Sequence, residues 1–273
     1  IVLGTMTFGR EADDTASANI LDAALEAGVN CIDTANTYAH TESERVLARL
    51  LAGRRDQVIL TSKVCGPVGE GPNGRGLSRR HIIASCEDSL RRLGTDHLDI
   101  YFMHYTDDRC DPEIPLRAMD ELVQSGKVRY IGASTAEIEI LPMAQATGLG
   151  VMTYSPLGAG VLTGKYTRRH GGAEGRLATD KQYQARYHRQ SDYEVGNNLA
   201  ALAQEAGYEP ATLAAAWALH NESVHAVITS ARRVEQLHPV LAAGTTELPT
   251  DLAQRVSELV PPVPLATDRD EER

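Results

Sequence analysis

The sequence alternates short apolar segments with longer amphipathic ones along almost its whole length, in a unit that recurs at roughly 30 residues. Apolar runs such as Val29–Ala35 (VNCIDTA) lack polar alternation, which is typical of strands buried on both faces of a parallel sheet. The segments between the runs place apolar residues at helical spacing, as Ile82, Cys86 and Leu90 do. This alternation indicates repeated βαβ units and predicts an α/β fold with a parallel sheet.

The pattern predicts seven strands, at Ile1–Met6, Val29–Ala35, Gln57–Val64, His97–His104, Val128–Ser134, Gly150–Leu157 and Ala226–Ala231. Helices are predicted at Asp13–Ala27, Glu42–Ala52, Ser78–Leu93, Ile114–Ser125, Ala136–Thr147, Asn198–Gly207, Pro210–His220, Val234–Ala243 and Asp251–Val260. Ser78 is a favourable N-cap and Gly94 a favourable helix stop. The polar segment Gly164–Asp192 is predicted to be a long surface loop.

A closed parallel (β/α)₈ barrel needs eight strands, one more than the pattern supplies. The strand that ends at Ser134 and Thr135 is followed at once by a helix and the next strand, a step shorter than every other unit. We therefore expect a single TIM-barrel domain over residues 1–273, with one βα unit missing from this sequence after about residue 135. The sequence also begins at Ile1 inside a strand, so we expect natural residues before it.

Composition restricts the class of partner. The chain has 27 Lys and Arg against 37 Asp and Glu, a net charge of −10, whereas nucleic-acid binding requires a basic surface. No apolar run is long enough to span a membrane, and no signal peptide is recognised. The four cysteines are scattered, and no His, Cys, Asp or Glu cluster has metal-ligand spacing. We expect a cytoplasmic protein that binds neither nucleic acid, nor membrane, nor metal; its oligomeric state cannot be predicted.

Four titratable side chains stand at or just after predicted strand ends, namely Asp33, Tyr38, Lys63 and His104. Active sites of (β/α)₈ enzymes are built at the carboxyl ends of the strands. A nearby Lys lowers the pKa of a Tyr, Asp33 can pair with Lys63, and His104 can hydrogen-bond a carbonyl oxygen. Each residue alone fits an ordinary role, as a turn cap, packed ring, strand-end cation or buried histidine. Their convergence on one rim favours catalysis with Tyr38 as general acid.

These residues lie in segments that resemble the aldo-keto reductase family: DTANTY (Asp33–Tyr38), LTSKV (Leu60–Val64) and DIYFMH (Asp99–His104). GTMTFG (Gly4–Gly9), GKVRYIGAS (Gly126–Ser134) and YSPLGAGVLTGKY (Tyr154–Tyr166) are similar to its long-chain bacterial members, which are related to the potassium-channel beta-subunit-like branch. The resemblance runs nearly end to end. It implies a (β/α)₈ barrel, a catalytic tetrad at Asp33, Tyr38, Lys63 and His104, and hydride transfer from NADPH to an aldehyde or ketone.

The resemblance also implies a cofactor site across the barrel mouth, without the glycine fingerprint G-x-G-x-x-G. The residues it implicates are Gly4, Thr5, Met6, Ser134, Tyr154, Ser155, Leu157, Gly158, Lys165, Ser230, Ala231, Arg232 and Gln236. Tyr154 would stack on the nicotinamide and Ser134 would bind its carboxamide. Arg232 and Arg233 at a helix start favour a 2′-phosphate, hence NADP(H) over NAD(H). The simpler interpretations are a strand-to-helix turn for SPLGAG and surface charge for the two arginines.

The sequence departs from the family pattern at three places. Thr135 stands where Asn usually follows Ser, the strand that carries a carboxamide-binding Gln is absent, and Pro239–Val240 replaces a Glu-Asn pair at the adenine. Two other classes of function stay open: a cofactor-binding regulatory subunit with little turnover, and a barrel hydrolase or aldolase, in which Lys63 would form a Schiff base.

The substrate is the least constrained part of the prediction. Phe8, Tyr105 and the Gly164–Asp192 loop are expected to line the pocket for a small-molecule carbonyl substrate, with a ketosugar as one case.

Overall fold

The computed structural model describes residues 1–134, 140–166 and 175–260. The chain forms two compact units: unit 1 comprises Ile1–Tyr154 and His225–Leu241, and unit 2 comprises Ser155–Val224 and Ala242–Arg273. Unit 1 holds every strand found among the described residues, and unit 2 is helical.

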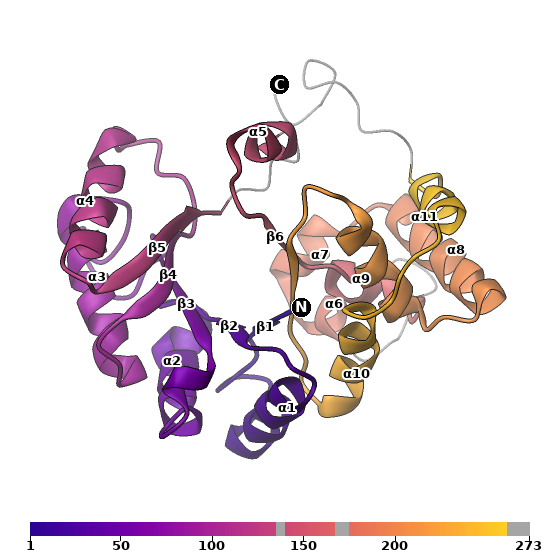
Figure 1. The fold of residues 1–273 in the computed structure, drawn as a ribbon, viewed down its shortest axis with the longest axis horizontal. Helices are drawn as coiled ribbons and strands as arrows, with labels where there is room; N and C mark the ends of the chain where they lie inside the picture. Colours follow the sequence, from indigo (N-terminus) through magenta and orange to yellow (C-terminus); the bar gives the residue numbers. More distant parts are fainter. Residues whose placement is uncertain (135–139, 167–174, 261–273) are drawn as a thin grey trace. The chain divides into compact units, whose positions relative to one another are not determined.

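The sheet of unit 1 has seven strands: β1 Val2–Gly4, β2 Cys31–Asp33, β3 Ile59–Val64, β4 Leu98–Met103, β5 Val128–Ala133, β6 Met152–Tyr154 and β7 Ala226–Thr229. All pairings are parallel, in the order β5-β4-β3-β2-β1-β7-β6. The first strand therefore pairs with the last one, as in a closed barrel, and the two edges are β5 and β6 (Figure 1). These edge strands flank the position where the sequence predicts a missing unit.

The helices of unit 1 are α1 Asp14–Glu26, α2 Glu42–Leu50, α3 Arg79–Leu93, α4 Glu113–Gln124 and α5 Ile140–Thr147, with α10 Val234–Ala243 shared between the units. Helices α1 to α4 lie along the outer side of the curled sheet (Figure 1). Helix α3 begins where predicted, because the Ser78 side chain accepts a hydrogen bond from the His81 amide, and it ends at left-handed Gly94 (φ 66°). Its buried face joins apolar residues of the strands, such as Leu60 and Leu98, in one core.

Unit 2 contains α6 Arg176–Thr179, α7 Lys181–Arg186, α8 Gln190–Ala206, α9 Pro210–His220 and α11 Thr250–Ser257, together with the short 3₁₀ segment η3 Gly158–Thr163. Its core joins α8, α9 and α11 through side chains such as Leu199, Leu213 and Leu252. Trp217 on α9 donates a hydrogen bond of 2.9 Å to Ser257 on α11.

Most predicted elements are confirmed, with strands shorter than expected. The prediction of one long loop over Gly164–Asp192 was wrong in part, because α6, α7 and the first residues of α8 lie within it. The expected missing unit falls at residues 135–139, outside the described residues. No described helix is long and apolar enough to cross a membrane.

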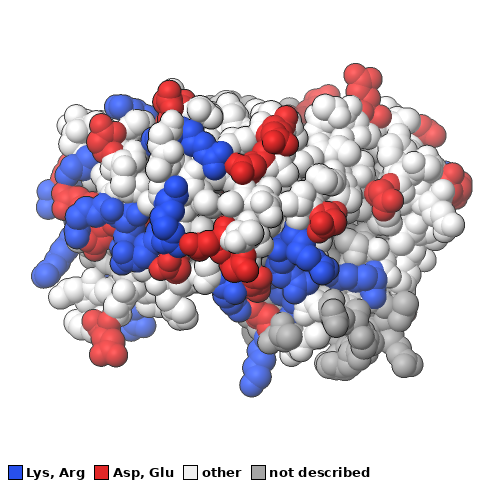
Figure 2. Space-filling view, turned by 90° about the horizontal axis from the view of Figure 1, so that it is seen from below, with Lys and Arg blue, Asp and Glu red and all other residues white. Residues whose placement is uncertain are grey.

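Surface charges of both signs are interspersed on the face drawn in Figure 2. Several exposed arginines are paired with carboxylates, as Arg49 is with Asp14 at 2.8 Å and Arg79 with Glu121 at 2.5 Å. On this face the basic side chains do not form a continuous basic surface.

Candidate active site

The predicted residues Asp33, Lys63 and Tyr38 meet at the carboxyl end of β2 and β3. The Lys63 ammonium donates hydrogen bonds to Asp33 Oδ2 (2.6 Å), to the Thr34 carbonyl (2.9 Å) and to Tyr38 Oη (3.1 Å). Thr61 donates to the other carboxylate oxygen, Asp33 Oδ1, at 2.7 Å. Asp33 and Lys63 are only 2% and 6% exposed, so this is a buried ion pair extended to a phenol.

Burial and Lys63 have opposite effects on the pKa of Tyr38. Burial raises the pKa of Tyr38 above its ordinary value, while the charge of Lys63 and its hydrogen bond oppose this rise. Lys63 therefore acts on the Tyr38 pKa in the predicted direction, but burial, which the sequence did not indicate, has the larger effect and the pKa rises. Burial also acts to lower the pKa of Lys63, but the Asp33 charge and the hydrogen bonds outweigh it and the pKa is raised. At neutral pH the pair is therefore an ammonium beside a protonated phenol.

His104, directly after β4, lies beside Tyr38. The two ring centroids are 5.8 Å apart and nearly perpendicular, and Tyr105 stacks on the other side of His104 at 4.3 Å. Burial, followed by the charge of Lys63, lowers the pKa of His104 to about 3. The imidazole is therefore neutral at physiological pH, so it can form hydrogen bonds but carries no extra proton to release. Its Nδ1 is buried without a hydrogen-bond partner among the described residues.

The segment that presents Tyr38 is strained. Three residues in succession after it, Ala39, His40 and Thr41, have left-handed backbone conformations with φ of 49°, 53° and 77°. Non-glycine residues rarely adopt this region, and such outliers cluster at functional sites. The strained turn carries the chain from Tyr38 directly into α2, which begins at Glu42.

A second buried network lies behind the site and was not foreseen from the sequence. Glu44 on α2 is fully buried, accepts a hydrogen bond from Ser62 at 2.7 Å and pairs with Arg92 at 2.5 Å. Ser43 next to it hydrogen-bonds Thr5 at 2.9 Å. The signal that could have indicated Glu44 is a glutamate at an apolar position of the α2 pattern.

Nine of the predicted cofactor residues lie in unit 1. Gly4 ends β1 opposite Asp33, Thr5 and Met6 follow it, and the Thr5 amide donates to the Asp33 carbonyl at 2.9 Å. Ser134 follows β5, where its amide donates to Met103, and exposed Tyr154 ends β6. The remaining four, Ser230, Ala231, Arg232 and Gln236, lie between β7 and the first turn of α10. All belong to the same end of the parallel sheet as the tetrad.

At the start of α10, Gln236 folds back and accepts a hydrogen bond from the Arg232 amide at 3.0 Å. Among the described residues neither Arg232 nor Arg233 has a carboxylate partner. Two uncompensated guanidiniums at a helix N-terminus form a donor set suited to a phosphate.

The remaining predicted cofactor residues, Ser155, Leu157, Gly158 and Lys165, lie in unit 2. Ser155 (φ 58°) and Gly158 (φ 52°) are left-handed, and the Gly158 amide donates to the Ser155 carbonyl, so SPLG forms a tight turn before η3. Leu157 packs against the α8–α9–α11 core. The Lys165 ammonium lies 4.9 Å from the Tyr166 ring centroid.

Of the expected pocket residues, Tyr105 is 54% exposed beside His104, whereas Phe8 is fully buried in the core and lines no open surface. The Gly164–Asp192 segment is in unit 2, and residues 167–174 of it lie outside the described residues.

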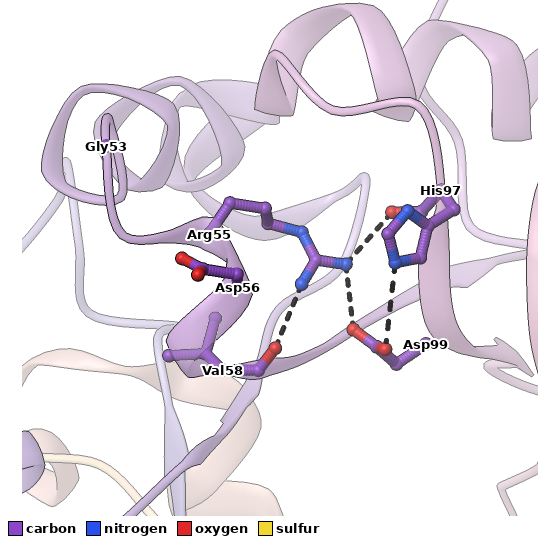
Figure 3. Close-up of a pocket in the computed structure, with 6 residues that line it drawn as sticks. All are labelled: Gly53, Arg55, Asp56, Val58, His97 and Asp99. Atoms are coloured by element: carbon purple, nitrogen blue, oxygen red, sulfur yellow. Dashed lines mark hydrogen bonds and ion pairs between the residues drawn. The ribbon is translucent and has the colours of Figure 1, made fainter.

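Two other features resemble binding sites, but both are closed by contacts within the fold. Gly69–Gly74 (GEGPNG) has the spacing G-x-G-x-x-G, which was not expected. The Val68 amide donates to the Gly74 carbonyl and the Gly74 amide to the Gly71 carbonyl, so the loop closes on itself. It also does not lead directly into a helix, as the dinucleotide-binding fingerprint does. A hollow of about 510 Å³ lies at the opposite ends of β3 and β4 (Figure 3). There Arg55 is fully engaged, with Asp99 at 2.7 Å and with backbone carbonyls, so the charges are compensated within the fold.

Within the part of the chain that the structure describes, no group of three or more His, Cys, Asp or Glu side chains is arranged to hold a metal ion.

Comparison with known proteins agrees with this geometry. The sequence model of the Aldo/keto reductase family matches residues 1–141 and 135–261. The uncharacterized oxidoreductase YrpG of Bacillus subtilis is 32% identical over 308 aligned positions, covering 96% of this chain and 92% of the relative. A probable voltage-gated potassium channel subunit beta of rice is 32% identical, covering 85% of this chain and 83% of its own. A putative aryl-alcohol dehydrogenase of Schizosaccharomyces pombe is 28% identical over 97% of this chain and 93% of its own. The chain belongs to the aldo/keto reductase family.

Proposed function

We propose that the protein is an NADP(H)-dependent oxidoreductase that reduces an aldehyde or ketone to an alcohol. The observation that carries the proposal is the buried Lys63 ammonium held between Asp33 Oδ2 at 2.6 Å and Tyr38 Oη at 3.1 Å. This arrangement suits a phenol that must release a proton and then stabilise the resulting negative charge. Membership of the family and two relatives named as an oxidoreductase and a dehydrogenase support the reaction class.

In the proposed reaction Tyr38 donates its proton to the substrate carbonyl oxygen. Lys63 stabilises the phenolate by charge and hydrogen bond, and Asp33 keeps that lysine charged in a buried position. His104 orients the same oxygen through a hydrogen bond. Because its pKa is low, the imidazole is neutral and does not compete with Tyr38 as the proton donor. NADPH, when bound, supplies the hydride that the carbonyl carbon receives.

The residues at the start of α10 fit the nucleotide end of that cofactor. Ser230 and the two guanidiniums of Arg232 and Arg233 supply donors beside a helix N-terminus. A 2′-phosphate carries additional negative charge that guanidinium groups bind well, so the proposed preference is NADP(H) over NAD(H). Tyr154 and Ser134 are proposed to hold the nicotinamide, with Gly4, Thr5 and Met6 close by.

We also propose that the natural fold is a single (β/α)₈ barrel over residues 1–273 in which one βα unit is missing from this sequence. The edges β5 and β6 are the strands that precede and follow the short step after residue 135. The family match is broken into two parts at that place, and the alignment with YrpG spans more positions than the 273 residues of this chain.

The scattered, free cysteines agree with the proposed cytoplasmic location.

The two alternative functions differ in their support. A Schiff-base aldolase needs a neutral Lys63, whereas its raised pKa and three acceptor contacts favour the ammonium. A regulatory cofactor-binding subunit is favoured by the similarity to the rice protein named as a potassium channel subunit beta.

The test is to titrate the purified protein with NADPH and NADH, following Trp217 and tyrosine fluorescence, and then to add a panel of aldehydes and ketones. We expect tighter binding of NADPH and its consumption with at least one carbonyl compound, identified by loss of reduced-cofactor absorbance and by the alcohol formed. Tight binding with no consumption across sugar-type, aliphatic, dicarbonyl and aromatic substrates would favour the regulatory alternative. Absence of binding would contradict the proposed function.

A further inference from the structure

The Asp33 carboxylate is held at both of its oxygens by side chains of one strand. Lys63 donates to Oδ2, and Thr61, two residues earlier on β3, donates to Oδ1 at 2.7 Å. Side chains two residues apart on a strand point to the same face. Asp33 and Thr61 are also direct partners in the β2–β3 pairing, so the carboxylate lies opposite the hydroxyl that holds it.

The burial of Thr61 gives this hydrogen bond its weight. Thr61 is fully buried and Asp33 is 2% exposed, so water cannot replace either hydrogen-bonding partner. A carboxylate held at both oxygens cannot rotate about its bond to the β-carbon without losing one of the two hydrogen bonds. The Lys63 ammonium is thereby held in the position from which it reaches Tyr38.

We propose that Thr61 is a positioning residue of the active site, which fixes the rotation of the Asp33 carboxylate so that Lys63 stays aligned with the Tyr38 hydroxyl. The inference rests on the proposed function. Thr61 hydrogen-bonds Asp33 and not Tyr38, so it acts on the phenol through Asp33 and Lys63.

The charged and titratable groups around Tyr38 are Asp33 from β2, Lys63 from β3, and His104 and Tyr105 after β4. Lys63 lowers the pKa of Tyr38, and Asp33 raises it. When the carboxylate can turn, Lys63 loses its alignment with Tyr38, so its lowering effect on the Tyr38 pKa weakens and the phenol should ionise at higher pH. Loss of alignment should also slow proton transfer more than it weakens substrate binding.

The test compares Thr61→Val, which keeps the shape and removes the hydroxyl, with Thr61→Ser, which keeps the hydroxyl. Ser62→Ala is the matched control, since Ser62 is equally buried on the same strand and loses a hydroxyl bond to Glu44 instead. For Thr61→Val we expect kcat to fall about tenfold or more, with KM and NADPH affinity within about threefold. The alkaline limb of its kcat profile should move to higher pH by about half a unit. Thr61→Ser should restore both, and Ser62→Ala should leave both near wild type.

A readout independent of turnover separates this inference from the proposed function. The ¹³Cζ resonance of Tyr38, assigned by its absence in Tyr38→Phe, reports the ionisation and hydrogen bonding of the phenol. We expect Thr61→Val to move this resonance more than Ser62→Ala does, whether or not a substrate has been found. If Thr61→Val matches Ser62→Ala in kcat, pH profile and resonance position, Thr61 has no positioning role, even if the protein proves to be a reductase.

Discussion

Replacement of Lys63 by Met should separate what the buried ion pair does for stability from what it does for catalysis. The substitution leaves the Asp33 carboxylate, which is 2% exposed, with Thr61 as its only remaining side-chain donor among the described residues. It also removes the donor to the buried Thr34 carbonyl. Loss of one partner from a buried ion pair costs about 3–5 kcal/mol of unfolding free energy. For a chain of this size that should lower Tm by about 10 °C.

The double variant Asp33→Asn/Lys63→Met removes the stranded charge and should regain more than half of the loss, while still lacking catalytic activity. Lys127→Met is the control, because Lys127 pairs with Glu87 at the same 2.6 Å but on the surface, and solvent screening should make its effect small. Urea unfolding followed by circular dichroism gives the unfolding free energy of each of the three variants relative to wild type. If Lys63→Met is as stable as Lys127→Met, or the double variant is no more stable than Lys63→Met, the buried-charge reasoning is wrong.

This effect should depend on pH with a definite sign. The folded-state pKa of Lys63 is raised above its ordinary 10.5, so its contribution is complete below that pH and is lost as pH rises through the raised value. The stability difference between wild type and Lys63→Met should therefore shrink at strongly alkaline pH.

Three further predictions concern the surroundings of the site. The pKa of His104 is about 3 in the folded protein against 6.5 ordinarily, so the unfolded chain takes up the proton first and stability falls as pH drops from 6.5 toward 3. In His104→Asn the unfolding free energy, measured by urea unfolding, should therefore fall less between pH 7 and 4. Ala39 is left-handed at φ 49°, so Ala39→Gly should raise the unfolding free energy by about 1 kcal/mol; an unchanged or lowered value would show that the strain is absent. Replacing Arg232 and Arg233 by Ala should weaken NADPH binding about tenfold more than NADH binding; equal weakening in a fluorescence titration would mean that they do not contact the 2′-phosphate.

The elements whose signals are local were predictable from the sequence. Ser78 and Gly94 delimit α3 because capping chemistry acts within one turn. The proximity of Asp33, Lys63 and Tyr38 could be predicted because parallel strands bring their carboxyl ends together. The strands are shorter than their apolar runs, since pairing depends on a partner strand and not on apolarity alone. Helix α8 begins earlier than predicted, at Gln190, because its first turns carry too few apolar residues to show the period.

The finer organisation of the site depends on contacts between distant residues, which the sequence does not encode in any local pattern. Nothing near Thr61 in the chain indicates that its hydroxyl meets Asp33. An apolar Phe8 suits a pocket wall as well as a core, so its burial could not be predicted either. The net direction of the Tyr38 pKa needed the extent of burial, which outweighs the neighbouring Lys63. The left-handed turn after Tyr38 was also not predictable, because Ala39 and Thr41 do not favour that conformation.

The most direct test of the central claim compares Tyr38→Phe with the wild type on the same carbonyl substrate. The substitution removes one hydroxyl, which accepts a hydrogen bond from Lys63 at 3.1 Å, and leaves the ion pair with Asp33 in place. If Tyr38 is the general acid, kcat/KM should fall by about three orders of magnitude while NADPH affinity stays within about threefold. Retention of most of the activity by Tyr38→Phe, with NADPH still bound, would show that the proton comes from another group and would contradict the proposed mechanism.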